Sequence, residues 1–110
     1  MKPSDLLKQY VSLHNYGVET ADFDPLMALF TDDIIFEFED PRIGKFEGIE
    51  LLRGVFHRQG PTASILIDDI TEEGQNARAR YTDEDRSDIW LGNILLEVDG
   101  DKIKRIYITR

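Results

Sequence analysis

The chain has 110 residues, which suits a single domain spanning residues 1–110. Hydrophobic residues make up 41% of the chain and charged residues 32%, a balance typical of globular rather than disordered proteins. The net charge of −9 argues against nucleic acid as a partner, because its binding depends on neutralising phosphates, and against anionic membrane surfaces.

The cysteine count and the N-terminal segment narrow the class further. The chain has no cysteine, which excludes disulfides, thiolate nucleophiles and cysteine metal sites. The opening segment, MKPSDLLKQY, has neither the apolar core nor the cleavage site of a signal peptide. No apolar run approaches the ~18 residues of a membrane span. We therefore expect a cytoplasmic protein.

The first 30 residues predict two helices. Residues 4–17 have apolar side chains at helical spacing, with Ser4 as the expected N-cap and Gly17 as the expected end. Residues 23–30, FDPLMALF, predict a short helix that Asp24 caps, with a proline in its first turn.

A strand and a third helix follow. Residues 34–40 alternate between apolar and acidic side chains, as a strand with one buried face does. Residues 43–48, IGKFEG, predict a short strand or turn. Residues 49–58 predict a helix whose buried side carries Ile49, Leu52, Val55 and Phe56.

The second half of the chain predicts four strands in succession. They cover residues 63–71, 76–82, 89–98 and 102–110, with turn sequences at EEGQ and DGD. Two helices, a strand, a helix and an antiparallel meander indicate an α+β fold with helices on the concave face of a curved sheet. Such an arrangement can leave an apolar pocket between the helices and the sheet.

The end of the first predicted strand raises a functional question. Phe36 and Phe38 fall on the inner face of that strand, and Asp40 falls on the same face two residues later. One interpretation is a buried acid at a pocket. The other is that the strand ends there and Asp40 begins a turn.

The order of these elements carries a family resemblance. Together with the segments YVSLHN, DFDPLMALFTDDIIFEFEDP, GKFEGIELLRGVF and LLEVDGDKIKRI, it resembles the nuclear-transport-factor-two-like superfamily, in its SnoaL-like and ketosteroid-isomerase-like branch. The resemblance implies a cone-shaped, curved mixed or antiparallel sheet with three helices packed on its concave face, a cystatin-like α+β barrel. It also implies a pocket at the open end and frequent dimers. It does not imply one activity.

The resemblance suggests particular site residues. Tyr10 matches a tyrosine that donates a hydrogen bond to an enolate oxygen in ketosteroid isomerase. Asp40 matches the general base of that enzyme if extra residues precede it, whereas an ungapped alignment puts Phe38 there. The third acidic position falls on Ile94, or on Asn93 if the strand bulges. Because neither is an acid, steroid isomerisation itself is not expected.

These observations predict a catalytic group of Asp40, Tyr10 and His14. Asp40 is the expected base, while Tyr10 and His14, one turn apart on the first helix, are the expected hydrogen-bond donors. For Tyr10 and His14 the alternative is an ordinary core residue with its polar atoms bound. The expected pocket walls are Phe36, Phe38, Phe56, Trp90 and Ile94.

Neither a cofactor nor a metal is expected, since the two histidines and the carboxylates show no metal-ligand spacing. Two functions remain open. One is cofactor-free acid–base chemistry (isomerisation, cyclisation, hydration or dehydration) on a small apolar carbonyl-like molecule. The other is a non-catalytic ligand-binding or dimerisation module. Under either, both faces of residues 89–98 are apolar, which predicts a homodimer through the outer face of the sheet.

Overall fold

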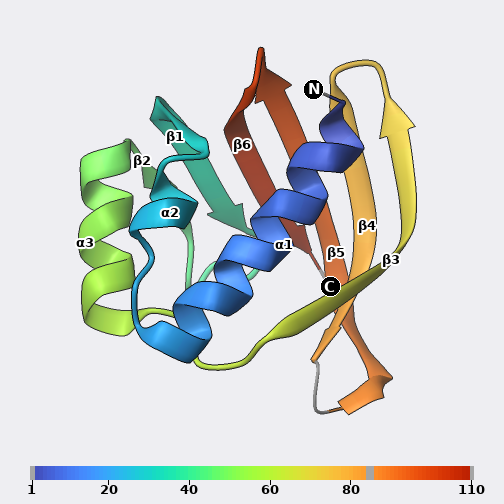
Figure 1. Cartoon of the computed structure of the whole chain (residues 1–110), viewed down its shortest axis with the longest axis horizontal. Helices are drawn as coiled ribbons and strands as arrows, with labels where there is room; N and C mark the ends of the chain where they lie inside the picture. Colours follow the sequence, from blue (N-terminus) through green and yellow to red (C-terminus); the bar gives the residue numbers. More distant parts are fainter. Residues whose placement is uncertain (1, 84–85, 110) are drawn as a thin grey trace.

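A computed structural model describes residues 2–83 and 86–109 of the chain, and the side chains of these residues except 83 and 86–90. One curved, unclosed sheet has helices lying across one face (Figure 1). Its strand order is β2-β1-β6-β5-β4-β3. The elements are α1 (Pro3–Thr20), α2 (Asp24–Met27), β1 (Phe30–Phe38), β2 (Lys45–Glu47), α3 (Ile49–Gln59), β3 (Ile65–Glu73), β4 (Asn76–Asp83), β5 (Arg86–Asp99) and β6 (Lys102–Thr109).

The pairing of the strands makes the sheet mixed. Strands β3 to β6 pair antiparallel in sequence order, as the predicted meander requires. Strand β1 pairs antiparallel with β2 and parallel with β6. The predicted α+β class and curved sheet are therefore confirmed.

The first helix begins and ends at residues other than those predicted. Pro3 takes the first helical position, so Ser4 lies inside the helix and its hydroxyl contacts Glu72 of β3 instead of capping. Gly17 does not end the helix, which continues to Thr20 and stops where Ala21 adopts a left-handed conformation with φ 63°. The backbone N–H of Ala21 bonds the carbonyl oxygen of Gly17 at 2.7 Å.

The second helix is also shorter than predicted. Phe23, not Asp24, is its N-cap, and Asp24 is the first helical residue. The Asp24 N–H is bound by the side chain of Asp22 at 3.1 Å. The chain turns into β1 at Phe30 because Phe30, Ile34 and later alternate side chains enter the core of the sheet.

The core lies between the concave face of the sheet and the helices. Its fully buried side chains come from every layer, namely Leu6, Leu7, Leu26, Ile34, Leu52, Ile94, Leu96, Ile103 and Ile106. Among the described residues, His14 is the polar or charged residue that is buried in this core. Among the described helices, none is both long and apolar enough to cross a membrane.

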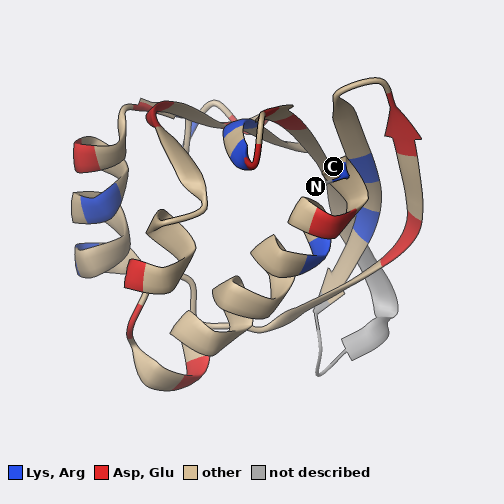
Figure 2. Ribbon diagram, turned by 45° about the horizontal axis from the view of Figure 1, so that its top comes forward, with Lys and Arg blue, Asp and Glu red and all other residues tan. Residues whose placement is uncertain are grey.

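The outer face of the sheet is rich in charge. Figure 2 shows basic positions on β4 beside acidic positions on β3. Arg80 lies 3.9 Å from Asp68 and Arg78 lies 3.0 Å from Glu73, so both arginines pair with acidic side chains of β3. On β5, Leu95 is half-buried on this same face, opposite the buried Ile94 and Leu96.

Candidate functional site

Between the concave face of the sheet and helices α1 and α3 lies an apolar cavity, called the inner cavity below. Its volume is 140 Å³, smaller than the ~300 Å³ and upward of drug-sized ligand sites. An apolar cavity of roughly 150 Å³ holds benzene, so the inner cavity holds about one six-membered ring. Its walls include Phe36, Phe38, Phe56, Ile65, Ile94 and Ile108.

Four of the five predicted wall residues thus line the inner cavity, and the fifth, Trp90, has a side chain outside the described set. The strands place these side chains by simple alternation. Phe36 and Phe38 lie two residues apart on β1 and share its inner face, with ring centroids 5.3 Å apart. Phe56 reaches the same space from α3, with its ring 6.0 Å from that of Phe36.

The residues with polar side-chain atoms that line the inner cavity are Tyr10, His14 and Tyr81. Tyr10 and His14 are one turn apart on α1, so they lie on the same side of the helix. Their ring centroids are 5.9 Å apart, and both residues are nearly inaccessible to solvent. Two of the three predicted catalytic residues therefore lie together at one cavity.

The protonation of both groups is set mainly by burial. Burial raises the pKa of the Tyr10 hydroxyl far above its ordinary value of 10, and the nearby Tyr81 raises it further. Burial lowers the pKa of His14 below its ordinary value of 6.5, and its hydrogen bond to Asn15 opposes that effect only in part. At neutral pH the cavity therefore presents a neutral phenol and a neutral imidazole.

Asn15 is a residue that the sequence did not single out. The helical pattern places it on the polar side of α1, yet its side chain bridges His14 and strand β3. The oxygen Oδ1 lies 2.9 Å from His14 Nδ1 and accepts the Ile65 backbone N–H at 2.9 Å. Its Nδ2 donates to the Ile65 carbonyl oxygen at 2.8 Å. No sequence signal marks this bridge, because it depends on where β3 begins in space.

Asp40 does not line the inner cavity. Strand β1 ends at Phe38, and Asp40 begins the turn that follows, with its backbone carbonyl accepting from the N–H groups of Ile43 and Gly44. Its carboxylate accepts from the backbone N–H, Nε and Nη2 of Arg42 at 3.0, 3.1 and 2.8 Å. This geometry matches the interpretation in which the strand ends and Asp40 begins a turn.

A second hollow, of 370 Å³, lies at the end of β1, and is called the mouth hollow below. Asp40 and Arg42 line it, together with Phe38, Tyr81 and Ile108. The last three also line the inner cavity. Asp40 is thus separated from the inner cavity by shared side chains, at the place where the resemblance puts the pocket opening.

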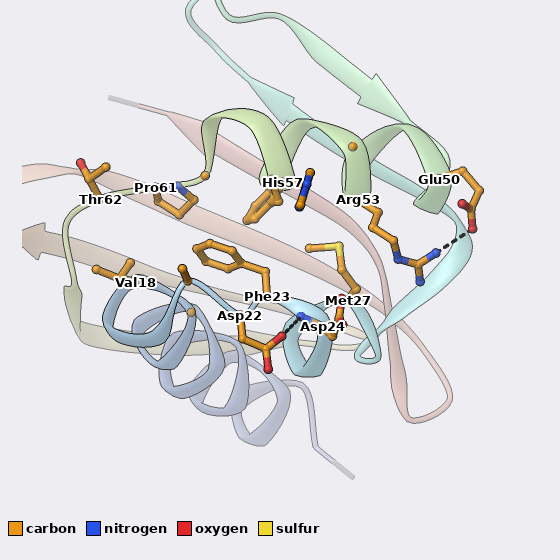
Figure 3. A pocket seen from close by; sticks show the side chains of 15 residues that line it. Val18, Asp22, Phe23, Asp24, Met27, Glu50, Arg53, His57, Pro61 and Thr62 are labelled. Carbon is orange, nitrogen blue, oxygen red and sulfur yellow. Dashed lines mark hydrogen bonds and ion pairs between the residues drawn. The ribbon is translucent and has the colours of Figure 1, made fainter.

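A third hollow, of 690 Å³, is the outer groove between α1, α2 and α3. Phe23 and Met27 form its floor, and His57 and Arg53 come from α3 (Figure 3). Arg53 is paired with Glu50 at 2.7 Å. Because its charged residues are exposed and partly paired with each other, the groove lacks the buried acid–base groups of the inner cavity. Phe56 and Pro61 line both spaces.

Within the described residues there is no group of three or more histidine, aspartate or glutamate side chains that could hold a metal ion.

A model of the SnoaL-like domain matches residues 11–106 of the chain. The chain belongs to the SnoaL-like family. No curated protein of known function matches the sequence significantly.

Solved structures support the same fold for this SnoaL-like domain. A cystatin-fold protein from Novosphingobium aromaticivorans is 21% identical, with a TM-score of 0.72 over 100% of this chain and 99% of that one. An NTF2-like protein of unknown function from Cytophaga hutchinsonii is 14% identical, with a TM-score of 0.72 over 98% and 88%. An LEH-like epoxide hydrolase from M. tuberculosis is 19% identical, with a TM-score of 0.69 over 92% and 79%.

The match over residues 11–106 confirms the SnoaL-like resemblance of the sequence, and the solved structures show the cystatin-like fold. At such low identities they establish the fold and not an activity, since one fold of this kind hosts many functions. The function has to be argued from the inner cavity itself.

Proposed function

We propose that this SnoaL-like domain binds a small, neutral carbonyl compound in the inner cavity and transfers a proton on it without a cofactor. The observation that carries the proposal is that Tyr10 and His14 line one apolar cavity with ring centroids 5.9 Å apart. The cavity volume of 140 Å³ limits the reacting part of the ligand to about one six-membered ring.

Each group has one role in the proposed reaction. The Tyr10 hydroxyl donates a hydrogen bond to the carbonyl oxygen, which accumulates negative charge as the reaction proceeds. The neutral His14 accepts a proton from the carbon next to the carbonyl. The C–H electron pair forms the enolate double bond, and the carbonyl π pair moves to oxygen. Return of the proton to the same carbon completes an exchange, and its return to the γ-carbon of an enolate that is conjugated with a further C=C bond completes an isomerisation.

The protonation states support these roles. Burial raises the pKa of Tyr10, so its hydroxyl keeps its proton and acts as a donor over the whole physiological range. Burial lowers the pKa of His14, so its imidazole is unprotonated and ready to accept. The imidazolium and the enolate form together, so the net charge of the cavity does not change, and the Tyr10 hydrogen bond stabilises the negative charge on the enolate oxygen.

Asp40 remains the alternative base, acting from the mouth hollow. The fold resemblance supports it, and the position of the carboxylate outside the inner cavity argues against it. The second candidate function is a non-catalytic binding module. The observation that favours it is the binding of the Asp40 carboxylate by Arg42, which leaves the inner cavity with a single neutral base.

Proton exchange into a simple ring ketone tests the proposal without knowledge of the natural substrate. Cyclohexanone is incubated with the protein in D₂O, and exchange of its α-protons for deuterium is followed by NMR. Its binding is measured in parallel from ligand-induced chemical-shift changes of the inner-cavity residues. The variants are Tyr10→Phe, His14→Gln and Asp40→Asn.

We expect catalysed exchange that His14→Gln abolishes while binding persists. Tyr10→Phe should slow the exchange, by about 10²-fold if its effect is like that of a single oxyanion donor. Loss of exchange in Asp40→Asn alone would assign the base to the mouth hollow. Binding without exchange in the wild type would identify a binding module, and the absence of both would overturn the proposal.

A further inference from the structure

The histidine of the inner cavity is held at one of its two ring nitrogens. Nδ1 of His14 lies 2.9 Å from Oδ1 of Asn15, and the ring is almost fully buried. The orientation of the Asn15 amide decides what this contact means, since an amide oxygen accepts and an amide nitrogen donates.

Strand β3 fixes that orientation. Asn15 Oδ1 accepts the backbone N–H of Ile65, which can only donate, at 2.9 Å. Asn15 Nδ2 donates to the carbonyl oxygen of Ile65, which can only accept, at 2.8 Å. A flipped amide would place two donors together and two acceptors together. The backbone of one residue therefore determines which end of the Asn15 amide faces His14.

It follows that His14 Nδ1 meets an acceptor. A ring nitrogen within hydrogen-bond distance of an acceptor must carry the proton. In a neutral imidazole only one nitrogen is protonated, so the other nitrogen, Nε2, carries a free electron pair. His14 lines the inner cavity, and Nε2 is the ring nitrogen that Asn15 does not contact.

We propose that Asn15 is a positioning residue that holds His14 in the Nδ1–H tautomer, so that Nε2 enters the reaction as a base and not as an acid. The inference deepens the proposed function and rests on it for the part that concerns catalysis. It also sets the direction of the chemistry, since the neutral His14 can remove a proton from the ligand in the first step but has none to give at Nε2.

The surroundings contain few competing groups. The titratable side chains that line the inner cavity with His14, among those described, are Tyr10 from α1 and Tyr81 from β4. Both carry hydroxyls, so neither places a formal charge beside the imidazole while protonated. Asn15 is therefore the polar contact that selects the tautomer. In serine proteases, loss of the group that fixes the histidine tautomer lowers kcat by about 10⁴-fold.

The tautomer can be read directly by nitrogen NMR. The protein has two histidines, so a ¹⁵N-labelled His57→Gln protein gives signals from His14 alone. At neutral pH we expect one protonated nitrogen, Nδ1, and one unprotonated nitrogen, Nε2, whose resonance lies far downfield. A wild-type ring with the proton on Nε2, or a mixture of both forms, would overturn the inference.

Variants of Asn15 test the cause. In Asn15→Leu the acceptor is lost, and we expect the proton to shift to Nε2 in most molecules and α-proton exchange to fall by at least about tenfold. Asn15→Asp keeps an acceptor for Nδ1–H, so it should keep the Nδ1–H tautomer and raise the pKa of His14 through its charge. Gln9→Leu, the same type of change on the exposed side of α1, should alter neither.

The outcomes separate the inference from the proposed function. The NMR measurement needs no ligand, so a correct tautomer with no exchange in any variant would sustain the assignment of Asn15 and reject the enzyme. If the wild type catalyses exchange and Asn15→Leu exchanges at the same rate, the proposed function is sustained and the role of Asn15 is rejected. Asn15 also joins α1 to β3, so Asn15→Leu has to be shown folded by its amide spectrum. If it does not fold, Asn15→Asp is the test, since a His14 ring protonated at Nε2, or a pKa of His14 that does not rise, would overturn the assignment of Asn15.

Discussion

Gly17 of α1 and the ring of Phe23 lie so close together that no side chain fits on Gly17. A Cβ placed there would overlap the Phe23 ring. On the other side of the ring, a Cβ on Gly60 would lie 2.7 Å from Phe23 Cε2. Phe23 therefore sits between the two glycines and joins the end of α1 to the end of α3, with its ring edge-on to Phe56 at 5.2 Å.

This packing predicts opposite effects for two glycine-to-alanine changes within helices. Gly17→Ala should lower the free energy of unfolding by about 1–3 kcal/mol, because overlap with Phe23 outweighs the better helix propensity of alanine. Gly54→Ala should raise it by about 0.5–1 kcal/mol, since a Cβ there meets only the tip of Arg58 at 3.7 Å. Urea unfolding measures both. Equal effects of the two changes would contradict the role of Phe23.

The buried His14 predicts how stability depends on pH. Its pKa is lowered in the folded state, so as pH falls below 6.5 the unfolded chain takes up a proton that folded His14 does not. The contribution of His14 to the free energy of unfolding should be fully present above that pH. Below it, the free energy of unfolding should fall by up to about 1.4 kcal/mol per pH unit, until the pH reaches the pKa of His14 in the folded protein.

Denaturant unfolding between pH 7.5 and 5.5 tests this dependence. His14→Phe should flatten the curve over that range, because it removes the group whose proton uptake differs between the two states. His57→Gln, on the exposed side of α3, should keep the wild-type slope. A slope that survives in His14→Phe would place the titrating group elsewhere.

Phe56 separates the inner cavity from the outer groove. Phe56→Ala should join the two spaces and admit a ligand of two fused rings, such as naphthalene, that the wild type excludes by size. Because Phe56 is only half-buried, the loss of stability should be smaller than the ~3–5 kcal/mol of a fully buried Phe→Ala change. Ligand-induced shifts in melting temperature report binding. Leu51→Ala, an exposed change on the same helix, should admit only the smaller ring.

The contact between Asp40 and Arg42 should contribute little to folding. The Arg42 side chain is 87% exposed, and exposed ion pairs contribute little, because water screens the charges and the pairing orders two side chains. Asp40→Asn should therefore leave the unfolding midpoint nearly unchanged, as should Arg42→Gln. A loss of several kcal/mol in Asp40→Asn would mean that the carboxylate supports the turn after β1 more strongly than its contact with Arg42 does.

The outer face of the sheet is the predicted homodimer surface. Arg105 lies there between Glu37 at 3.1 Å and Glu97 at 3.6 Å, next to the half-buried Leu95. We expect a dimer in sedimentation experiments at micromolar concentration, and we expect Leu95→Glu to convert it to a monomer. Leu51→Glu on α3 should leave the dimer intact. A wild-type monomer at that concentration would reject the prediction.

Local patterns in the sequence were sufficient for most of the fold. The alternation around Phe36, the helical spacing of α3 and the four strands after residue 63 all predict the observed elements, because each pattern reflects one buried face. Helix ends were predicted less well. Gly17 has the residue type of a helix end, but it is a glycine because Phe23 occupies the space of a side chain.

The candidate site likewise has features that the sequence predicted and features that only the structure showed. The position of Tyr10 and His14 on one side of α1 follows from their spacing of four residues, so the sequence alone predicted that they face the core together. The sequence also determined the charge, the lack of thiol chemistry and the family.

Two features of the site depended on contacts between residues far apart in the chain. Asp40 lies in a turn because the ladder of β1 with β6 ends at Phe38, and Asn15 meets His14 in a fixed orientation because β3 begins beside α1 at Ile65. Only the tertiary structure could decide these, because hydrogen-bond partners 50 residues away leave no trace in a local pattern.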